Sequence, residues 1–373
     1  MKALTPAAQE LADDGYLLLP AFAEPHAHLD KAFLAERVEN TTGDLLGAIL
    51  AMEAARDSIT VADTIDRAER AARLMALNGC TAIRTHVDLC LAARLTSVEA
   101  LLEVRRRLRE LVEIQVAVLA ACPVIGISGA DQRALVREAV AMGVDVIGGC
   151  PHLEEDPAES NDTLLSLAAE AGLPVDLHTD ETLNPKMLAL EDLAERVLAT
   201  GFPHPVAASH CVSLSLQTEQ RQREVAEKVA AAGISVIALP HTNLFLQGRD
   251  NQVAMPRAVT AVRALRSAGV TIAAGADNLQ DPFNLVGRAD PLETAALLVM
   301  AGHVAPEEAY TAVSRASRAA LGLPATGVVP GAPAELLAVR ATSLREAIAA
   351  ASHDRVVVHR GRVVSRTRVV QEA

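Results

Sequence analysis

The stretch AERAARLMALNGCTAIRTHVD, residues 68–88, contains in one unit the pattern that organises the whole chain. Ala68–Leu77 is rich in Ala, Leu, Glu and Arg, Asn78-Gly79 follows it, and Thr81–Val87 is apolar and β-branched. Gly is typical directly after a helix, and a short apolar run is typical of a strand buried on both faces. The stretch therefore predicts a helix, a turn and a buried strand.

The same order of helix, Gly and apolar run recurs along the chain, at residues 132–147, 164–177, 224–239 and 259–274. Helices that alternate with buried strands indicate a parallel sheet, and seven or eight such strands favour a (β/α)8 TIM barrel. The tail differs, because residues 327–331, 335–339 and 355–364 predict short strands and a hairpin. We expect a barrel over residues 20–322 and a small β-rich appendage formed by residues 1–19 and 323–373.

Charge and composition exclude several classes of function. The net charge of -13 argues against a nucleic-acid partner and favours a small neutral or cationic substrate. No apolar run reaches the length of a membrane span, about 20 residues. The cysteines are 5 in number and form no Cys-x-x-Cys pair, which predicts reduced thiols in the cytoplasm. Barrel enzymes often associate through their outer helices, so a homo-oligomer is compatible with the pattern.

A His-x-His pair lies in PHAHLD, residues 25–30, directly after the apolar run Tyr16–Phe22. Residues i and i+2 of a strand project from one face, so His26 and His28 can reach one metal ion from the end of a strand. Taken alone, the pair is equally compatible with a surface turn.

Polar residues end several other predicted strands, where a barrel places its active site. They are His86, Asp88, His178, Asp180, Glu181, His210, His241, Asn243, Asp277 and Asn278. Catalytic Zn²⁺ or Fe²⁺ needs several nitrogen and oxygen ligands, which His26, His28, His178 and Asp277 would supply. Glu181 could carry a proton to a ring nitrogen or a leaving amine.

These motifs resemble the cytosine deaminase branch of the amidohydrolase superfamily. The matching segments are EPHAHLDK (24–31), RTHVD (84–88), HTDE (178–181), ASH (208–210), NLFLQGR (243–249) and GADNLQDPFNLVG (275–287). The resemblance implies that His26, His28, His178 and Asp277 bind the metal and that Glu181 shuttles protons. It also implies that His210 polarises the attacking water or the substrate carbonyl, and that residues 327–339 belong to an appended β-sandwich.

Departures from the family pattern concern the substrate. Cytosine deaminase has a Gln that contacts the pyrimidine where this chain has Val124, which argues against cytosine. Asn278 replaces a carboxylate, and Lys31 could contact a substrate anion. We expect substrate contacts from Asn278, His86, Asp88, Val124, His241 and Lys31. Other roles stay open: Asn278 could be a capping residue, and His86 and Asp88 could support a metal ligand. His241 could have a plain loop role, and Lys31 could be a surface charge. The remaining histidines, including His152 and His359, are expected at the surface.

We predict a hydrolytic deaminase with one divalent ion, in which metal-bound hydroxide attacks a ring amidine carbon of a small nitrogen heterocycle and ammonia or an amine leaves. A second metal would need a bridging lysine near residues 144–149, and the lysines are Lys2, Lys31, Lys186 and Lys228. Opening of a cyclic amide or imide by the same residues is the alternative. A non-catalytic metal-binding barrel would predict loss of Glu181 or His210, and both are present.

Overall fold

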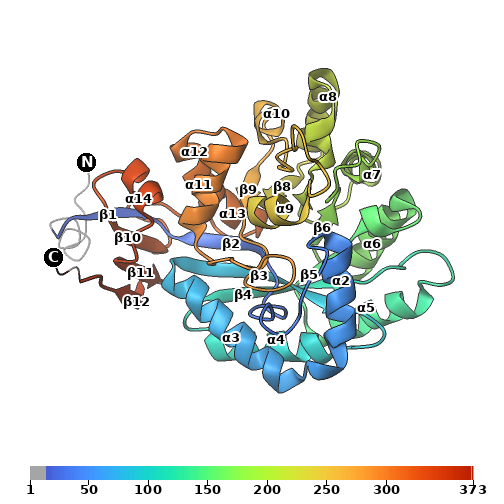
Figure 1. Ribbon diagram of the computed structural model, residues 1–373, viewed down its shortest axis with the longest axis horizontal. Helices are drawn as coiled ribbons and strands as arrows, with labels where there is room; N and C mark the ends of the chain where they lie inside the picture. The colour runs from blue at the N-terminus through green and yellow to red at the C-terminus, as the bar shows by residue number, and fades with distance from the viewer. Residues whose placement is uncertain (1–13, 371, 373) are drawn as a thin grey trace.

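The computed structural model describes residues 14–370 and 372 and contains two sheets. An 8-stranded parallel sheet runs in the order β2-β3-β4-β5-β6-β7-β8-β9, and a 4-stranded antiparallel sheet in the order β1-β10-β11-β12 lies beside it (Figure 1). The parallel sheet curves into a nearly closed barrel with helices around it, which confirms the predicted TIM barrel. Over the described residues, none of the helices is both long and apolar enough to cross a membrane.

The barrel strands follow one another in chain order: β2 (Phe22–Ala27), β3 (Cys80–Leu89), β4 (Glu113–Ala120), β5 (Val146–Gly149), β6 (Val175–Thr179), β7 (Val206–His210), β8 (Ser235–Ala238) and β9 (Ile272–Ala274). The α-helices are α2 (Leu45–Ala55), α3 (Val61–Leu77), α4 (Thr96–Leu108), α5 (Ala130–Met142), α6 (Pro157–Ala171), α7 (Ala189–Thr200), α8 (Glu219–Ala231), α9 (Pro240–Leu246), α10 (Val262–Ser267), α11 (Pro291–Gly302), α12 (Pro306–Ala312), α13 (Arg315–Ala320) and α14 (Leu344–Ala350). Short 3-10 turns are η1 (Arg56–Ser58), η2 (Pro151–Leu153) and η3 (Ser213–Leu216).

Glycine ends several of the helices as the sequence predicts. Gly143 after α5 and Gly172 after α6 have φ of 94° and 67°, and the backbone N–H of each donates to a carbonyl of the last helical turn. A residue with a Cβ is unfavourable in this left-handed conformation, so Gly at these positions fixes where the helix stops and the chain turns toward the next strand.

The first apolar run of the chain divides between the two sheets. Strand β1 (Tyr16–Pro20) pairs antiparallel with β10 (Leu336–Arg340), and β2 begins at Phe22. Strands β11 (Arg355–His359) and β12 (Arg362–Thr367) complete the small sheet. Within the predicted appendage, residues 1–13, 371 and 373 lie outside the described residues.

The barrel closes between its first and last strands through a few contacts beside the predicted metal ligands. Ala27 and Asp277 form an isolated parallel bridge, the backbone N–H of Asp277 donates to His26 O, and that of His28 donates to Asp277 O. The buried Glu24 side chain adds one bond across this seam, because it accepts from the backbone N–H of Ala276, and it also accepts from the N–H of His26 in its own strand. The seam therefore fixes His26, His28 and Asp277 relative to one another.

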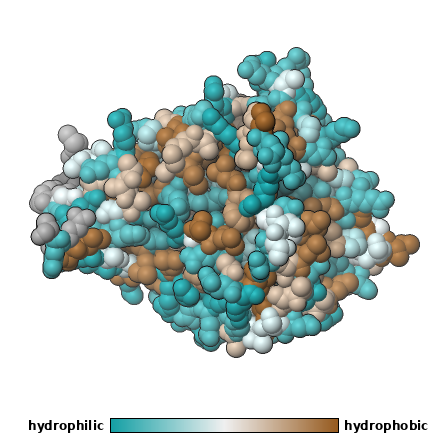
Figure 2. Space-filling view, in the orientation of Figure 1, coloured by the Kyte–Doolittle hydropathy of each residue, from teal (hydrophilic) through white to brown (hydrophobic). Residues whose placement is uncertain are grey.

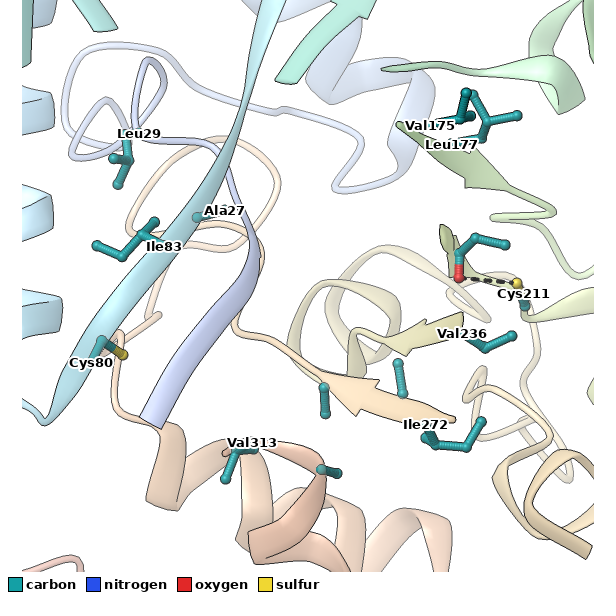
Figure 3. Close-up of a cluster of buried hydrophobic side chains, with 14 of the residues drawn as sticks. Ala27, Leu29, Cys80, Ile83, Val175, Leu177, Cys211, Val236, Ile272 and Val313 are labelled. Carbon is teal, nitrogen blue, oxygen red and sulfur yellow. Dashed lines mark hydrogen bonds between the residues drawn. The ribbon is translucent and has the colours of Figure 1, made fainter. Parts of the chain in front are cut away.

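Side chains alternate between the two faces of each barrel strand. Outward-facing residues such as Ile83, Val175 and Val236 belong to the main hydrophobic core with the surrounding helices (Figure 3). Inward-facing residues near the start of the strands are small, and Ala320 and Leu321 at the end of α13 pack against them. Above them, Arg84 on β3 donates to Asp176 on β6, two strands that are not neighbours, so this ion pair crosses the barrel interior.

Gly148 on β5 has no room for a side chain, which yields a stability prediction. A Cβ there would lie 2.6 Å from Val118 O and 2.8 Å from Asp176 O, both backbone atoms of neighbouring strands. Gly148→Ala should lower the free energy of unfolding by roughly 1–3 kcal/mol, the usual cost of overpacking. Urea unfolding would measure it, with Gly302→Ala as the control, because a Cβ at Gly302 meets only Leu298 Cδ2 at 3.8 Å. Equal stability of Gly148→Ala and the parent would contradict the prediction.

Candidate metal centre and active site

Three histidines and one aspartate converge where the barrel strands end. His178 Nε2 on β6 lies 3.1 Å from His26 Nε2 and 3.2 Å from His28 Nε2. Asp277 Oδ1, just after β9, lies 3.3 Å from His28 Nε2 and 3.7 Å from His26 Nε2. All of these side chains are buried. The ligand atoms of His26, His28 and Asp277 form one mutually close group, and those of His26, His86 and His178 form a second, so His26 is common to both.

A hydrogen-bond chain inside the barrel determines which nitrogen of His26 carries its proton. Ser209 Oγ donates its only proton to Asp176 Oδ1 at 2.9 Å and lies 2.9 Å from His26 Nδ1. Because that hydroxyl proton is already used, Ser209 must accept from His26, so the proton is on Nδ1. The lone pair of His26 is then on Nε2, which faces His178 and Asp277. Partners of this kind commonly fix the tautomer of a metal-binding histidine.

This set of atoms fits a divalent metal ion. Neither oxygen of Asp277 has a hydrogen-bond partner, although both are buried. Burial lowers the pKa of His26, His28 and His178 well below the usual value, and neighbouring cationic groups lower it further, so these imidazoles are neutral and able to bind a cation. Imidazole nitrogens with one carboxylate are ligands that Zn²⁺ and Fe²⁺ accept at catalytic sites.

Glu181 and His210 lie beside this centre. His210 Nδ1 is 3.0 Å from Asn243 Oδ1 and 3.6 Å from Glu181 Oε1, and His210 Nε2 is 3.9 Å from Asp277 Oδ2. Burial raises the pKa of Glu181 well above its usual value, and the charge of Asp277 adds to this effect. Glu181 therefore holds its proton more tightly than an exposed glutamate does.

The backbone turns sharply where these side chains leave their strands. Asp180, His210 and Asp277 have φ of 51°, 69° and 63°, in the left-handed region that non-glycine residues seldom adopt. Strained conformations of this kind cluster at functional sites. Asp180 accepts from the backbone N–H of Ala189 and Leu190 at the start of α7 and so holds the turn after β6 in place.

A cavity of about 560 Å³ opens directly onto the centre. Most of the predicted site residues line it: His28, Lys31, Asp88, His178, Glu181, His210, Asp277 and Asn278. Its described lining does not include Val124, His86 or His241, which were also predicted as substrate contacts. Val124 is buried and its backbone N–H donates to Glu154, His241 lies 3.4 Å from Glu293, and His86 stacks on His26 with ring centroids 4.0 Å apart.

Lys31 and Asn278 differ in how many of their hydrogen-bonding groups already have partners within the protein. The Lys31 ammonium lies 2.6 Å from Asp88 Oδ1 and 3.0 Å from His28 Nδ1. Burial alone would lower the pKa of Lys31, but the charges of Asp30 and Asp88 outweigh it and keep the ammonium charged. Asn278 accepts from Thr242 and donates to Asp281, so its amide contributes to packing of the loop after β9.

Several residues of the site were absent from the sequence-based prediction. Asp176, Ser209 and Arg84 lie inside apolar strand segments. The available signal was the two-residue spacing of Asp176 from His178 and of Arg84 from His86, which places each pair on one face, and Ser209 had no such spacing. Helix α2 was also missed, although Asp44 caps it and accepts from the backbone N–H of Gly47. His152 and His359 were expected at the surface, but both are buried, and His152 Nδ1 lies 3.0 Å from His178 O.

The buried Asp281, which accepts a hydrogen bond from Asn278, makes the stability of the fold depend on pH. Burial raises the pKa of its carboxyl group to about 7, even though Asn278 and the backbone N–H of Phe283 donate to it. The folded chain therefore binds this proton more tightly than the unfolded chain. The resulting stability is present below the unfolded pKa and is lost as the pH rises through about 7.

We predict that this one group lowers the free energy of unfolding of the metal-free protein by on the order of 3 kcal/mol between pH 4 and pH 7. In Asp281→Asn the same pH interval should show a correspondingly smaller decrease, whatever the absolute stability of the variant. Urea unfolding of both proteins at steps of pH measures the difference, and parallel pH profiles would show that Asp281 is not the group responsible.

Comparison with known proteins agrees with this geometry. The family profile described as amidohydrolase family matches residues 34–365. A pterin deaminase of Rhizobium rhizogenes (strain K84) is 34% identical over 358 residues, which cover 94% of this chain and 81% of the relative. The structure of 5-methylcytosine deaminase from Klebsiella pneumoniae liganded with 5-fluorocytosine superposes with a TM-score of 0.88 at 30% identity, over 96% of this chain and 88% of that one.

A third relative has a related activity by name. The structure of N-isopropylammelide isopropylaminohydrolase from Burkholderia multivorans superposes with a TM-score of 0.81 at 30% identity, over 95% of this chain and 87% of that one. These relatives bear out the predicted reaction class, metal-dependent hydrolytic deamination of a nitrogen heterocycle. The chain therefore belongs to the amidohydrolase family and is a hydrolase that acts on carbon–nitrogen bonds.

Proposed function

We propose that this enzyme deaminates a pterin-type heterocycle, replacing the amino group of a 2-amino-4-oxo ring with oxygen from water and releasing ammonia. The observation that carries the proposal is the 34% identity to a pterin deaminase along 94% of the chain. The cavity of about 560 Å³ supports it, because sites of roughly 300–1,000 Å³ accommodate ligands larger than a single pyrimidine ring. We also propose that the reaction takes place in the cytoplasm, in keeping with the free cysteines.

We propose His26, His28, His178 and Asp277 as ligands of one divalent ion, either Zn²⁺ or Fe²⁺. When bound, such an ion lowers the pKa of water to about 7 and so supplies a nucleophile at neutral pH. The contacts around Gly148 support a single ion, since a bridging lysine at that position would meet Val118 O and Asp176 O.

The protons of the reaction are assigned to Glu181 and His210. We propose that Glu181 gives its proton to a ring nitrogen, takes a proton from the attacking water and passes that proton to the departing amine, a role that its raised pKa favours. His210 is proposed to orient the attacking water through Nε2, because its Nδ1–H donates to Asn243 Oδ1 and leaves the lone pair on Nε2 to accept from water. Asp277 is proposed to take part in the same proton transfer, since its second oxygen lies 3.9 Å from His210 Nε2.

Lys31 and Asp88 are proposed to contact the ring oxygen and ring N–H of the substrate. Asp88 is more accessible than the metal ligands, with a side chain that is 41% exposed, and Lys31 holds it at 2.6 Å. An ammonium has three protons, of which Asp88 engages one. His28 carries its own proton on Nδ1 when Nε2 is the ligand atom and so accepts none from Lys31, which leaves protons of the ammonium free to donate to an oxo group. Asn278 is proposed as a weaker contact because Thr242 and Asp281 already engage its amide.

Ammonia release would test this proposal. Protein loaded with Zn²⁺ or with Fe²⁺ is assayed against 2-amino-4-oxopteridine, 5-methylcytosine, cytosine, guanine and N-isopropylammelide, with chelator-treated protein as the blank. We expect fastest release from the pteridine and little from cytosine. Isopropylamine release from N-isopropylammelide alone, or ring opening without ammonia, would overturn the proposed substrate class.

A further inference from the structure

Helix α2 presents an apolar stripe to the active-site cavity instead of to the protein core. Leu45, Ile49 and Met52 are spaced i, i+4 and i+7, which places them on one face of the helix. All three line the cavity and are half-buried. Only Ala48 of this helix is fully buried, so part of the surface of each of the three side chains is open to the cavity.

The cavity is therefore divided into two chemically different ends. One end contains the converging histidines and carboxylates with Lys31, and the other is bounded by the α2 stripe and by apolar residues after β3 and in β4, among them Ala92, Ala93 and Leu119. Glu53, Arg56 and Asp57 lie at the outer margin of the apolar end. Figure 2 shows hydrophobic side chains, drawn in brown, over the region of α2.

An apolar helix face is normally covered by a core, because leaving such a surface in water costs free energy. Leu45, Ile49 and Met52 line the cavity, so a molecule bound there can cover them. An unsubstituted heterocycle bound at the metal end is flat and carries polar atoms around its rim, so it does not match this apolar wall. A drug-sized molecule does match a cavity of about 560 Å³.

We propose that the substrate is a heterocycle with an apolar substituent, of alkyl or aryl type, on the ring that is not attacked, and that the α2 stripe binds this substituent. This inference rests on the proposed function, since it assumes that the amino-bearing ring is bound at the metal end. It makes Leu45, Ile49 and Met52 specificity-determining residues, and they take no part in the chemical step.

The test compares two substrates that differ only in the substituent: 2-amino-4-oxopteridine and the same compound with a butyl group at carbon 6. We expect wild-type kcat/KM to be at least about tenfold higher for the butyl compound, since a single methylene in a fitted apolar pocket is worth roughly tenfold or more. Ile49→Ala and Met52→Ala should each remove most of that preference, because kcat/KM for the butyl compound should fall at least about fivefold further than kcat/KM for the unsubstituted ring.

Leu50→Ala is the matched control, because Leu50 is the neighbour of Ile49 on α2 but is 54% exposed and faces away from the cavity. It should change neither rate. Equal rates for the two substrates, or equal loss on both in Ile49→Ala, would overturn the inference while the proposed function stands. If neither compound is deaminated, the proposed function fails. The inference is then tested by calorimetric binding of the two 2,4-dioxopteridine products, with and without the butyl group. It is overturned if the butyl product binds no more tightly than the unsubstituted one.

Discussion

Glu181→Gln is expected to lower turnover at least about 100-fold, the lower range for a general acid–base group, while metal content stays at the wild-type level. Gln has the size and shape of the protonated acid, so it can occupy the same position 3.6 Å from His210 Nδ1. It cannot release a proton to a departing amine. None of the proposed ligand atoms belongs to Glu181, which is why the metal should remain.

The measurement is steady-state ammonia release together with metal analysis of the same samples. Glu155→Gln is the matched control, because Glu155 is an exposed carboxylate that follows β5 on the same side of the barrel and is not among the residues that line the cavity. It should retain turnover within about twofold. If Glu181→Gln retains more than a tenth of wild-type turnover, Glu181 is not the proton carrier. Loss of metal from this variant would assign it a structural role.

The sequence was sufficient to predict the barrel and the convergence of the proposed ligands because both depend on signals that are local in the chain. A Gly after a helical segment and an apolar run after the Gly mark each repeat, and the polar residue after the run must lie at the carboxyl end of its strand. His178 and Asp277 are separated by many residues, yet parallel strands bring their ends together. The residue pattern also indicated Glu181 as a proton carrier, and the resemblance to deaminases added a role for His210; both roles remain proposals.

The position of a polar residue after an apolar run was less informative for residues farther from a strand end. Val124 follows β4 by several residues and His241 lies in α9, so where each side chain points depends on loop geometry that the sequence does not encode locally. Neither side chain is among those that line the cavity. The run Tyr16–Phe22 was similarly ambiguous, because two short strands that belong to different sheets can follow one another without a polar residue between them.

Polar residues on the inner face of the barrel were hidden by apolar neighbours. Asp176 lies between Val175 and Leu177 in a run that indicates a buried strand, and nothing in the sequence identifies Arg84 as its partner. Helix α2 escaped for a different reason. Leu46 and Leu50 are as apolar as the residues that line the cavity, so the pattern has no polar face, and no Gly marks the end of the helix.

The buried Asp176 gives the largest expected effect on stability. Arg84 Nη1 donates to Asp176 Oδ2 at 2.9 Å, and the Arg84 side chain is 2% exposed. Burial alone would raise the pKa of Asp176, but His86 and Arg84 outweigh it and hold the pKa below its usual value, so the carboxylate is charged. Asp176→Ala would leave a buried guanidinium without its counter-ion, and we expect the free energy of unfolding to fall by roughly 3–5 kcal/mol.

This variant should also weaken metal binding by about 10- to 100-fold, the usual effect of removing a group that orients a ligand. Without Asp176, the Ser209 hydroxyl can donate its proton to His26 Nδ1. His26 can then carry its own proton on Nε2, and in that tautomer Nε2 cannot bind the metal. Urea unfolding measures the first effect, and competition with a chromogenic chelator measures the second. Glu138→Ala is the control, because its ion pair with Arg94 is half exposed and is worth about 0–1 kcal/mol.

The double variant Arg84→Met, Asp176→Leu separates the two effects. Replacing a buried ion pair with apolar residues of similar volume is often neutral for stability, so the double variant should recover much of the folding free energy that Asp176→Ala loses. Metal affinity should stay low, because Ser209 still lacks its acceptor. If metal affinity returns together with stability, Asp176 acts only through the fold. If it stays low in a stable protein, the chain from Asp176 through Ser209 to His26 orients the metal ligand.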